Sequence, residues 1–171
     1  MVLRKYDFHW GLLGDVELGR PNLGHTTSVE VYRLMQFALR DVLEKKLGTT
    51  ETEALFYNAG KLAGEAFFDH FITPTGDIEH YIKQLQEHFK KLGIGILFVE
   101  KLDAHSGEMI ITISEDLDCS GLPELNYEIC TYDEGFVCAL LERFTGANYK
   151  VSEVDCWCTG DRTCRFTAVR V

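Results

Sequence analysis

The segment Tyr149–Cys164, YKVSEVDCWCTGDRTC, organises the C-terminal part of this chain. Apolar and polar residues alternate along its first half, which is typical of a strand with one buried face. A Gly-Asp pair at 160–161 supplies a turn, and a second apolar run then begins at Cys164. The pattern predicts a β-hairpin with strands over residues 148–158 and 164–171. With a three-residue turn, Cys158 lies opposite Cys164.

Three thiols and one carboxylate in this region form a candidate metal site: Cys130, Glu153, Cys156 and Cys164. Zinc favours a tetrahedron of such ligands, and an ionised Glu153 in an apolar row needs a partner. A regular strand points Glu153 and Cys156 to opposite faces, so this set requires a β-bulge or a strand end near residues 154–155. Three alternatives remain open: buried core cysteines, a Cys156–Cys164 disulfide, and a four-thiol site in which Cys158 replaces Glu153.

Composition and charge narrow the class of protein. The chain has 171 residues, 46% of them hydrophobic and 26% charged, which suits one soluble domain with a core. Its net charge of −10 disfavours binding to nucleic acid or to anionic lipid. No apolar run reaches transmembrane length and residues 1–5 carry no signal-peptide core, so we expect a cytoplasmic protein. Six cysteines in such a protein favour metal binding or free thiols over a disulfide framework.

Periodicity upstream of the hairpin predicts helices and then strands. Alternating residues predict a short strand over 5–10, and the turn-rich segment after it has room for a hairpin around 15–18. Helically spaced apolar residues between cap and stop signals predict four helices, over about residues 27–47, 50–71, 77–92 and 126–144. Apolar runs around a turn predict a hairpin of residues 94–100 and 109–114.

These elements define an α/β fold of the α+β kind. We expect a single domain, 1–171, with helices packed on an antiparallel sheet. Its parts are an N-terminal strand with turns over 1–25, a helical part over 26–93, and the sheet, fourth helix and zinc hairpin over 94–171.

Several short segments within about the last 45 residues match a known pattern: Ile129–Cys130, Glu134–Val137, Thr145–Gly146, Glu153–Cys156 and Gly160–Phe166. Together they resemble the 4-vinyl reductase domain family. The resemblance implies zinc bound by Cys130, Glu153, Cys156 and Cys164, as in sensor domains of phenol-responsive transcription activators, with Cys158 as a neighbour. It also implies an α/β fold shared with haem-based nitric-oxide sensors and a vesicle-tethering subunit, and it implies a homodimer.

Our leading hypothesis is a non-enzymatic domain that binds or senses a small hydrophobic or aromatic molecule. The zinc is expected to be structural, because four protein ligands leave no position for water or substrate. Candidate pocket residues are aromatic side chains of the helices and the sheet: Phe56, Phe67, Phe71, Tyr81, Phe89 and Phe98. We find no ATPase or DNA-binding pattern, so a sensor of this kind would signal through a partner protein or through its own oligomeric state.

Two alternatives come from other classes of function. One is a reductase, or an accessory protein, acting on a tetrapyrrole vinyl group. The sequence has neither a Gly-x-Gly-x-x-Gly fingerprint nor a second cysteine set for an iron–sulfur cluster, which disfavours an independent reductase. The other is a protein-interaction module that uses the fold for assembly.

Overall fold

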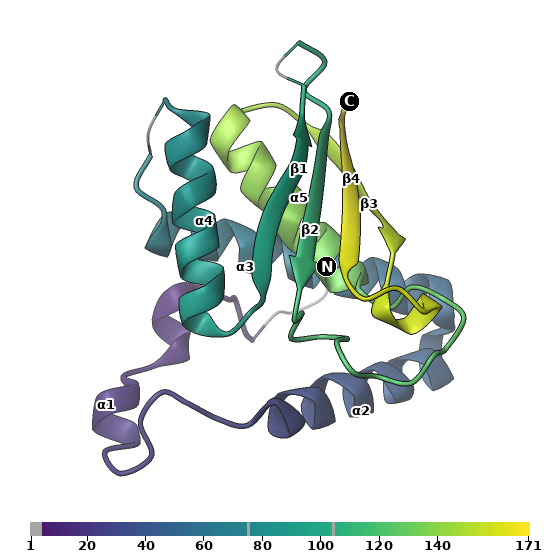
Figure 1. Cartoon of the computed structure of the whole chain (residues 1–171). Coiled ribbons are helices and arrows are strands. Elements are labelled where there is room, and N and C mark those ends of the chain that lie inside the picture. Colours follow the sequence, from purple (N-terminus) through teal and green to yellow (C-terminus); the bar gives the residue numbers. More distant parts are fainter. Residues whose placement is uncertain (1–4, 75, 104) are drawn as a thin grey trace.

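A four-stranded antiparallel sheet forms one layer of the computed structural model, which describes residues 5–74, 76–103 and 105–171. Its strands are β1 (Ile96–Leu102), β2 (Met109–Ser114), β3 (Tyr149–Asp155) and β4 (Cys164–Arg170). They lie in the order β1-β2-β4-β3, as Figure 1 shows from left to right. The sheet is therefore two hairpins, joined where β2 pairs with β4.

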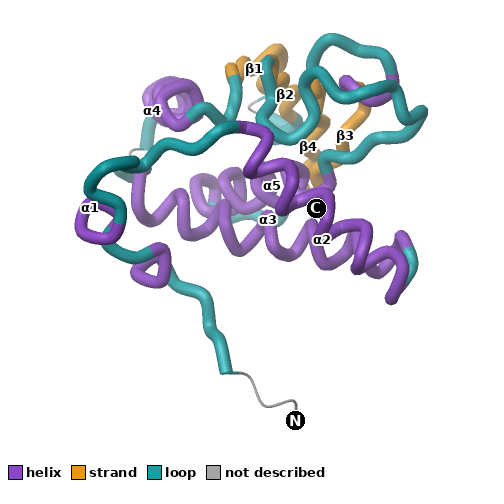
Figure 2. The backbone as a smooth tube through the Cα atoms, turned by 90° about the horizontal axis from the view of Figure 1, so that it is seen from below, coloured by secondary structure: helices purple, strands orange, loops and turns teal. Residues whose placement is uncertain are grey.

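The long helices are α2 (Val29–Leu47), α3 (Thr49–Phe71), α4 (Ile78–Leu92) and α5 (Thr131–Thr145). Helix α5 connects β2 to β3 and covers one face of the sheet, and α3 packs on the far side of α5 (Figure 2). Helix α4 lies beside β1. Helix α2 lies at the outside of the molecule, next to α3 (Figures 1 and 2).

Glycines allow α3 and α5 to approach at backbone contact. A Cβ added at Gly60 would lie 1.9 Å from the carbonyl oxygen of Tyr132, and one added at Gly135 would lie 2.0 Å from that of Tyr57. Gly64 faces the carbonyl oxygen of Phe136 in the same way, at 2.6 Å. Residues with a side chain at these positions would push the helices apart, so the small-residue stripe of α3 is a helix-packing surface.

The core lies between α5 and the sheet. It joins buried aliphatic residues of α5, such as Leu140, to Ile113 of β2 and Phe166 of β4. Tyr81 and Phe89 of α4 are also fully buried in it. At about 25 cal/mol per Å² of apolar surface, this continuous burial is the main stabilising contribution to the fold.

The structure confirms the single α+β domain, the four long helices and both hairpins. The predicted strand over 5–10 is wrong: residues 10–13 form a 3-10 helix, and the ring of Trp10 stacks on His70 of α3 at 4.0 Å. The predicted hairpin around 15–18 is also wrong, because that segment is the short helix α1 (Val16–Gly19). The expectation that the chain carries no signal peptide rests on residues 1–5, of which residues 1–4 lie outside the described residues.

The fourth helix begins five residues later than predicted, at Thr131 instead of Asn126. Asn126 has a φ of 63°, which no right-handed helix contains, and its N–H group donates to the Cys158 carbonyl oxygen at 3.1 Å. The segment before α5 is therefore fixed to the hairpin.

No helix in the described part of the chain is long and apolar enough to span a membrane.

Candidate metal centre and apolar groove

Four buried thiols meet at the end of the sheet where β3 and β4 are joined. The Sγ atoms of Cys119, Cys130, Cys156 and Cys164 all lie within 4.8 Å of one another. Cys119 comes from the loop after β2, Cys130 is the N-cap of α5, Cys156 follows β3 and Cys164 opens β4. The cluster thus gathers four separate segments of the chain.

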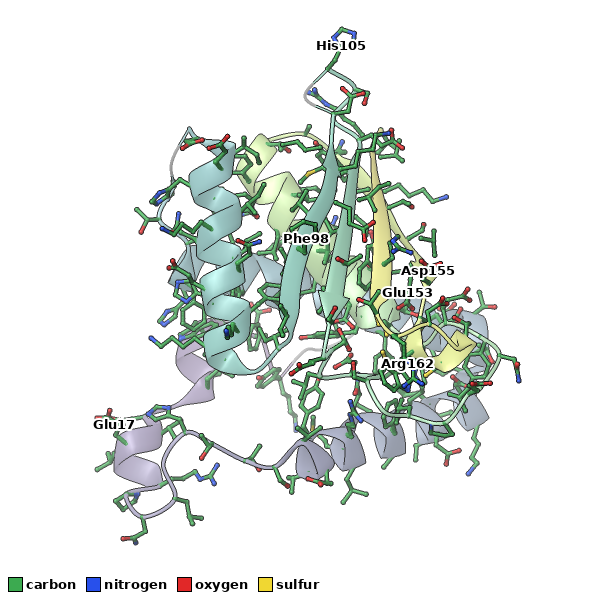
Figure 3. The ribbon with its side chains drawn as sticks, viewed as in Figure 1. Glu17, Phe98, His105, Glu153, Asp155 and Arg162 are labelled. Atoms are coloured by element: carbon green, nitrogen blue, oxygen red, sulfur yellow. The ribbon has the colours of Figure 1, made fainter. Side chains whose placement is uncertain are left out.

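A β-bulge brings Cys156 into this cluster. The register of β3 against β4 shifts between Glu153, which pairs with Phe166, and Asp155, which pairs with Arg165. This is the irregularity that the predicted ligand set requires, because it removes the strict alternation between Glu153 and Cys156. Figure 3 shows Glu153 and Asp155 together at this end of β3.

Cys158 lies beside the cluster but outside the group of four thiols among the described residues. The predicted pairing of Cys158 with Cys164 is wrong, since β3 ends at Asp155 and residues 157–159 form a 3-10 helix. Thr159 stabilises this turn, because its hydroxyl accepts the N–H of Cys156 at 3.2 Å. The longer connection places Cys156 next to Cys164.

The geometry of the thiols fits a tetrahedral metal ion. The Sγ of Cys130 lies 3.8 Å from those of Cys156 and Cys164, and a tetrahedron with Zn–S bonds of about 2.3 Å has edges of about 3.8 Å. Cys119 and Cys164 are closer, at 3.0 Å, so this edge would open by about 0.8 Å around zinc. All six cysteines of the chain are free thiols, so the Cys156–Cys164 disulfide does not form in this structure.

Electrostatics inside the cluster also favour a cation. Hydrogen bonds from the Cys119 and Cys130 thiols strongly lower the pKa of Cys156. The hydrogen bond with Cys119 and that with Cys156 raise the pKa of Cys164. One thiolate is therefore stabilised by neighbours that stay protonated, because several thiolates at this spacing repel one another. A divalent cation would replace the protons on these thiols and allow all four cysteines to ionise.

Glu153 lies against this cluster without belonging to the four-thiol group. Its Oε2 accepts the N–H of Cys130 at 3.3 Å, while its buried Oε1 has no hydrogen-bond partner among the described residues. Burial, with the nearby Cys156 charge, raises the pKa of Glu153 to about 9. Of the four predicted ligands the structure therefore brings together Cys130, Cys156 and Cys164, with Glu153 in contact with their edge.

Cys119 is the member that sequence reasoning missed. It follows β2 in a loop where Oδ1 of Asp116 accepts the N–H groups of Asp118, at 2.8 Å, and of Cys119, at 3.1 Å. An aspartate that binds the backbone two and three residues ahead is the signal of a fixed turn. The segment Asp116–Cys119 carries that signal. The periodicity of strands and helices, in contrast, does not predict where the side chain of a cysteine in a loop points.

An apolar groove of about 310 Å³ lies between α2 and α3. Its lining is nearly all apolar, and only Tyr32, Gln36 and Tyr132 contribute side chains with polar atoms. The full lining is Tyr32, Met35, Gln36, Leu39, Leu43, Leu55, Phe56, Ala59 and Tyr132. The Gln36 side chain is 92% buried, and its Oε1 has no hydrogen-bond partner among the described residues. The lining of the groove therefore includes a side chain with a buried, unpaired hydrogen-bond acceptor.

The six predicted pocket aromatics are spread over the domain and do not line one cavity among the described residues. Phe56 lines the groove, under the guanidinium of Arg40 at 4.5 Å. Phe67, Phe71 and Phe89 belong to an aromatic cluster that also contains His88 and Phe136. Tyr81 is buried beside Leu140, and Phe98 projects from the sheet face opposite α5 and is 58% exposed (Figure 3).

A helix and a hairpin joined by buried thiols define an α+β domain with a candidate metal centre near its C-terminus. Residues 109–170 match the V4R domain family model, which confirms the resemblance to the 4-vinyl reductase domain family over this part of the chain. An uncharacterized protein of Methanocaldococcus jannaschii, MJ0150, is 28% identical over 114 residues. That match covers 67% of this chain and 62% of the relative, so the chain spans less than two thirds of its length.

Two solved structures show how far the fold extends. The phenol-responsive sensory domain of the transcription activator PoxR, with phenol, has a TM-score of 0.63 at 14% identity, over 84% of this chain and 75% of that one. A trafficking protein particle complex subunit 3 from Naegleria fowleri, covalently bound to palmitic acid, has a TM-score of 0.64 at 15% identity. This match covers 84% of this chain and 95% of that one. At these identities the likeness establishes the fold.

Proposed function

We propose that this protein is a zinc-containing domain that binds a small hydrophobic or aromatic molecule without catalysing a reaction. The observation that carries the ligand site is an apolar groove whose lining includes Gln36, a side chain with a buried and unpartnered Oε1 among the described residues. A pocket with an apolar lining and one polar group selects a ligand with an apolar body and one hydrogen-bond donor. A phenolic or alcoholic hydroxyl meets both requirements.

The metal in this proposal is zinc, held by the thiolates of Cys119, Cys130, Cys156 and Cys164. Four cysteines make a closed structural site, which would fix the start of α5 to β3, β4 and the loop after β2. Glu153 would orient the Cys130 segment by accepting its backbone N–H. The family resemblance implies another ligand set, with Glu153 in place of Cys119, and the Glu153 carboxyl group interacts with the thiols of Cys130, Cys156 and Cys164.

Hydrogen bonds connect the groove to the thiol centre. Asp118 accepts the hydroxyl of Tyr32 at 2.8 Å and the amide Nε2 of Gln36 at 2.6 Å, and it directly precedes Cys119. Both Tyr32 and Gln36 line the groove. A ligand that engages Gln36 would therefore act on the loop that carries one of the zinc ligands. This connection supports a sensing role, in which ligand binding changes the surface offered to a signalling partner.

The exposed stripe of α2 supports a homodimer. Val31, Leu34, Met35 and Val42 lie at helical spacing, and each is more than half exposed. A second copy packed on this stripe would also cover the groove, since Met35 belongs to both. Leu34→Glu should shift a dimer to a monomer in light scattering. Leu23→Glu is the control, because Leu23 has the same exposed fraction, 72%, and lies outside α2. A monomeric wild-type protein would refute the dimer.

The ligand site is tested by titrating the purified protein with phenol in a calorimeter. Ala59→Phe should fill the groove and weaken phenol binding more than tenfold. Ala66→Phe is the matched control, because Ala66 lies on the same helix but lines a different surface hollow with Trp10 and His70. Equal phenol affinity in the wild type and in Ala59→Phe would refute the groove as the site.

A further inference from the structure

A second set of metal-binding groups lies directly behind the thiol cluster. Ligand atoms of Asp116, Cys130 and Asp133 all lie within 4.8 Å of one another. Asp116 and Asp133 are 98% and 93% buried, and Oδ2 of Asp133 has no hydrogen-bond partner in the described part of the chain. An unpaired carboxylate oxygen in the interior is costly unless a cation or a donor reaches it.

The nearby arginines do not neutralise these carboxylates. Arg33 directs its N–H groups at the backbone carbonyls of Asp116, Leu117 and Ser120, and Arg40 donates to that of Ile129. Among the described residues, neither Asp116 nor Asp133 forms an ion pair. Neither of these buried carboxyl groups therefore has a direct positive partner among the described residues.

We propose that Asp116, Asp133 and Cys130 hold a second divalent cation, with the Cys130 thiolate shared between two metal ions. This proposal rests on the thiol centre, because Cys130 belongs to both sites. Mixed oxygen and sulfur ligands suit zinc or cobalt better than magnesium or calcium. Metal ions bridged in this way lie about 3.5–4 Å apart.

The second ion would differ from the first in having an open coordination position. Three protein ligands leave a tetrahedral zinc one place for water or for a ligand oxygen. A cavity of about 190 Å³ adjoins Asp116 and Asp133, and its walls include Tyr32, Tyr132 and Phe136. An aromatic molecule that presents an anionic oxygen fits the chemistry of this cavity, with the oxygen on the metal and the ring against the aromatic walls.

Asp118 is a third buried aspartate near Asp116 and Asp133, but both of its carboxylate oxygens already have hydrogen-bond partners. Its two carboxylate oxygens accept Tyr32 and Gln36, so it positions the loop. Asp118→Asn therefore removes one buried charge from the cluster without removing a metal ligand. The Gln36 amide can rotate to offer its free Oε1 to the new Asn, which makes this variant the matched control.

The test is the number of zinc ions bound per chain. The full-length protein is stripped with a chelator under reducing conditions, reloaded with Zn²⁺ and weighed by native mass spectrometry. The wild type and Asp118→Asn should bind two zinc ions. Asp133→Asn and Asp116→Asn should bind one, with second-site affinity falling by more than about 100-fold, which exceeds the 10- to 100-fold effect of an outer-sphere group.

Other outcomes separate the two sites. One zinc in the wild type, retained in Asp133→Asn and lost in Cys164→Ser, would overturn the second site and leave the thiol centre standing. Two zinc ions in both aspartate variants would also overturn it. Absence of zinc from the wild type would overturn both sites. A melting temperature of metal-free Asp133→Asn at or above that of the wild type shows that the variant folds.

Discussion

Substituting Gly60 by alanine should weaken the fold and the metal centre together. The added Cβ would lie 1.9 Å from the carbonyl oxygen of Tyr132, whereas ordinary contacts begin at 3.4 Å, so α3 and α5 must separate locally by up to 1.5 Å. Alanine gains about 1 kcal/mol in helix propensity over glycine. Overpacking costs about 1–3 kcal/mol, and loosening the packing between the two helices adds to that cost.

We therefore expect the net loss in the free energy of unfolding to be about 2 kcal/mol. For a domain of this size that loss corresponds to a fall of about 4–8 °C in melting temperature. Tyr132 is two residues after Cys130, so moving the start of α5 also moves one thiol away from the other three. Zinc affinity should fall with stability.

Differential scanning calorimetry and competition with a zinc chelator measure the two effects. Gly19→Ala is the control, because a Cβ there meets no atom within 4 Å and should change stability by less than about 0.5 kcal/mol. A melting temperature of Gly60→Ala equal to or above the wild type would show that the helices are not held at backbone contact, and the reasoning would fail.

The remaining predictions concern single side chains. Cys119→Ser should lower zinc affinity at least tenfold in chelator competition, whereas Cys158→Ser should leave it nearly unchanged; the reverse order would contradict the four-thiol assignment. In metal-free protein, burial raises the pKa of Glu153 from 4.5 to about 9, so the folded state holds a proton that the unfolded state releases. As pH rises from 4.5 to about 9, the free energy of unfolding of the wild type should therefore fall relative to that of Glu153→Gln, as measured by urea unfolding. If the two proteins show parallel dependences of stability on pH, Glu153 is not buried in this way. Gln36→Met should weaken phenol binding about 3- to 10-fold, the contribution of one hydrogen bond, and leave toluene binding unchanged in parallel titrations. An equal loss for both ligands would mean that Gln36 shapes the groove without bonding the hydroxyl.

The sequence predicts the elements whose patterns are set by local packing. Helix α4 follows its apolar stripe and ends at Gly93, whose φ of 70° makes it a natural helix stop. The bulge in β3 was also foreseeable, because Glu153 and Cys156 cannot share a face of a regular strand. Trp10 shows the opposite case: its alternating neighbours look like a strand, yet its ring packs on α3 and no strand partner is present in the described residues.

The candidate site was only partly accessible from sequence, for a physical reason. Cys130, Cys156 and Cys164 follow spacings within a helix–hairpin unit, so local geometry brings them together. Cys119 arrives from a loop whose path depends on the Asp116 turn and on long-range bonds from α2. Likewise, the groove exists because α2 lies beside α3, an arrangement that no single-helix periodicity encodes.

Zinc K-edge X-ray absorption on the purified protein tests the central claim most directly, because it counts the sulfur ligands of the bound metal. With one zinc per chain, which occupies the thiol centre first, we predict four sulfur atoms at about 2.3 Å. Three sulfurs and one oxygen at about 2.0–2.2 Å would place Glu153, not Cys119, in the coordination sphere. A protein purified without zinc and unable to take it up would contradict the metal centre itself.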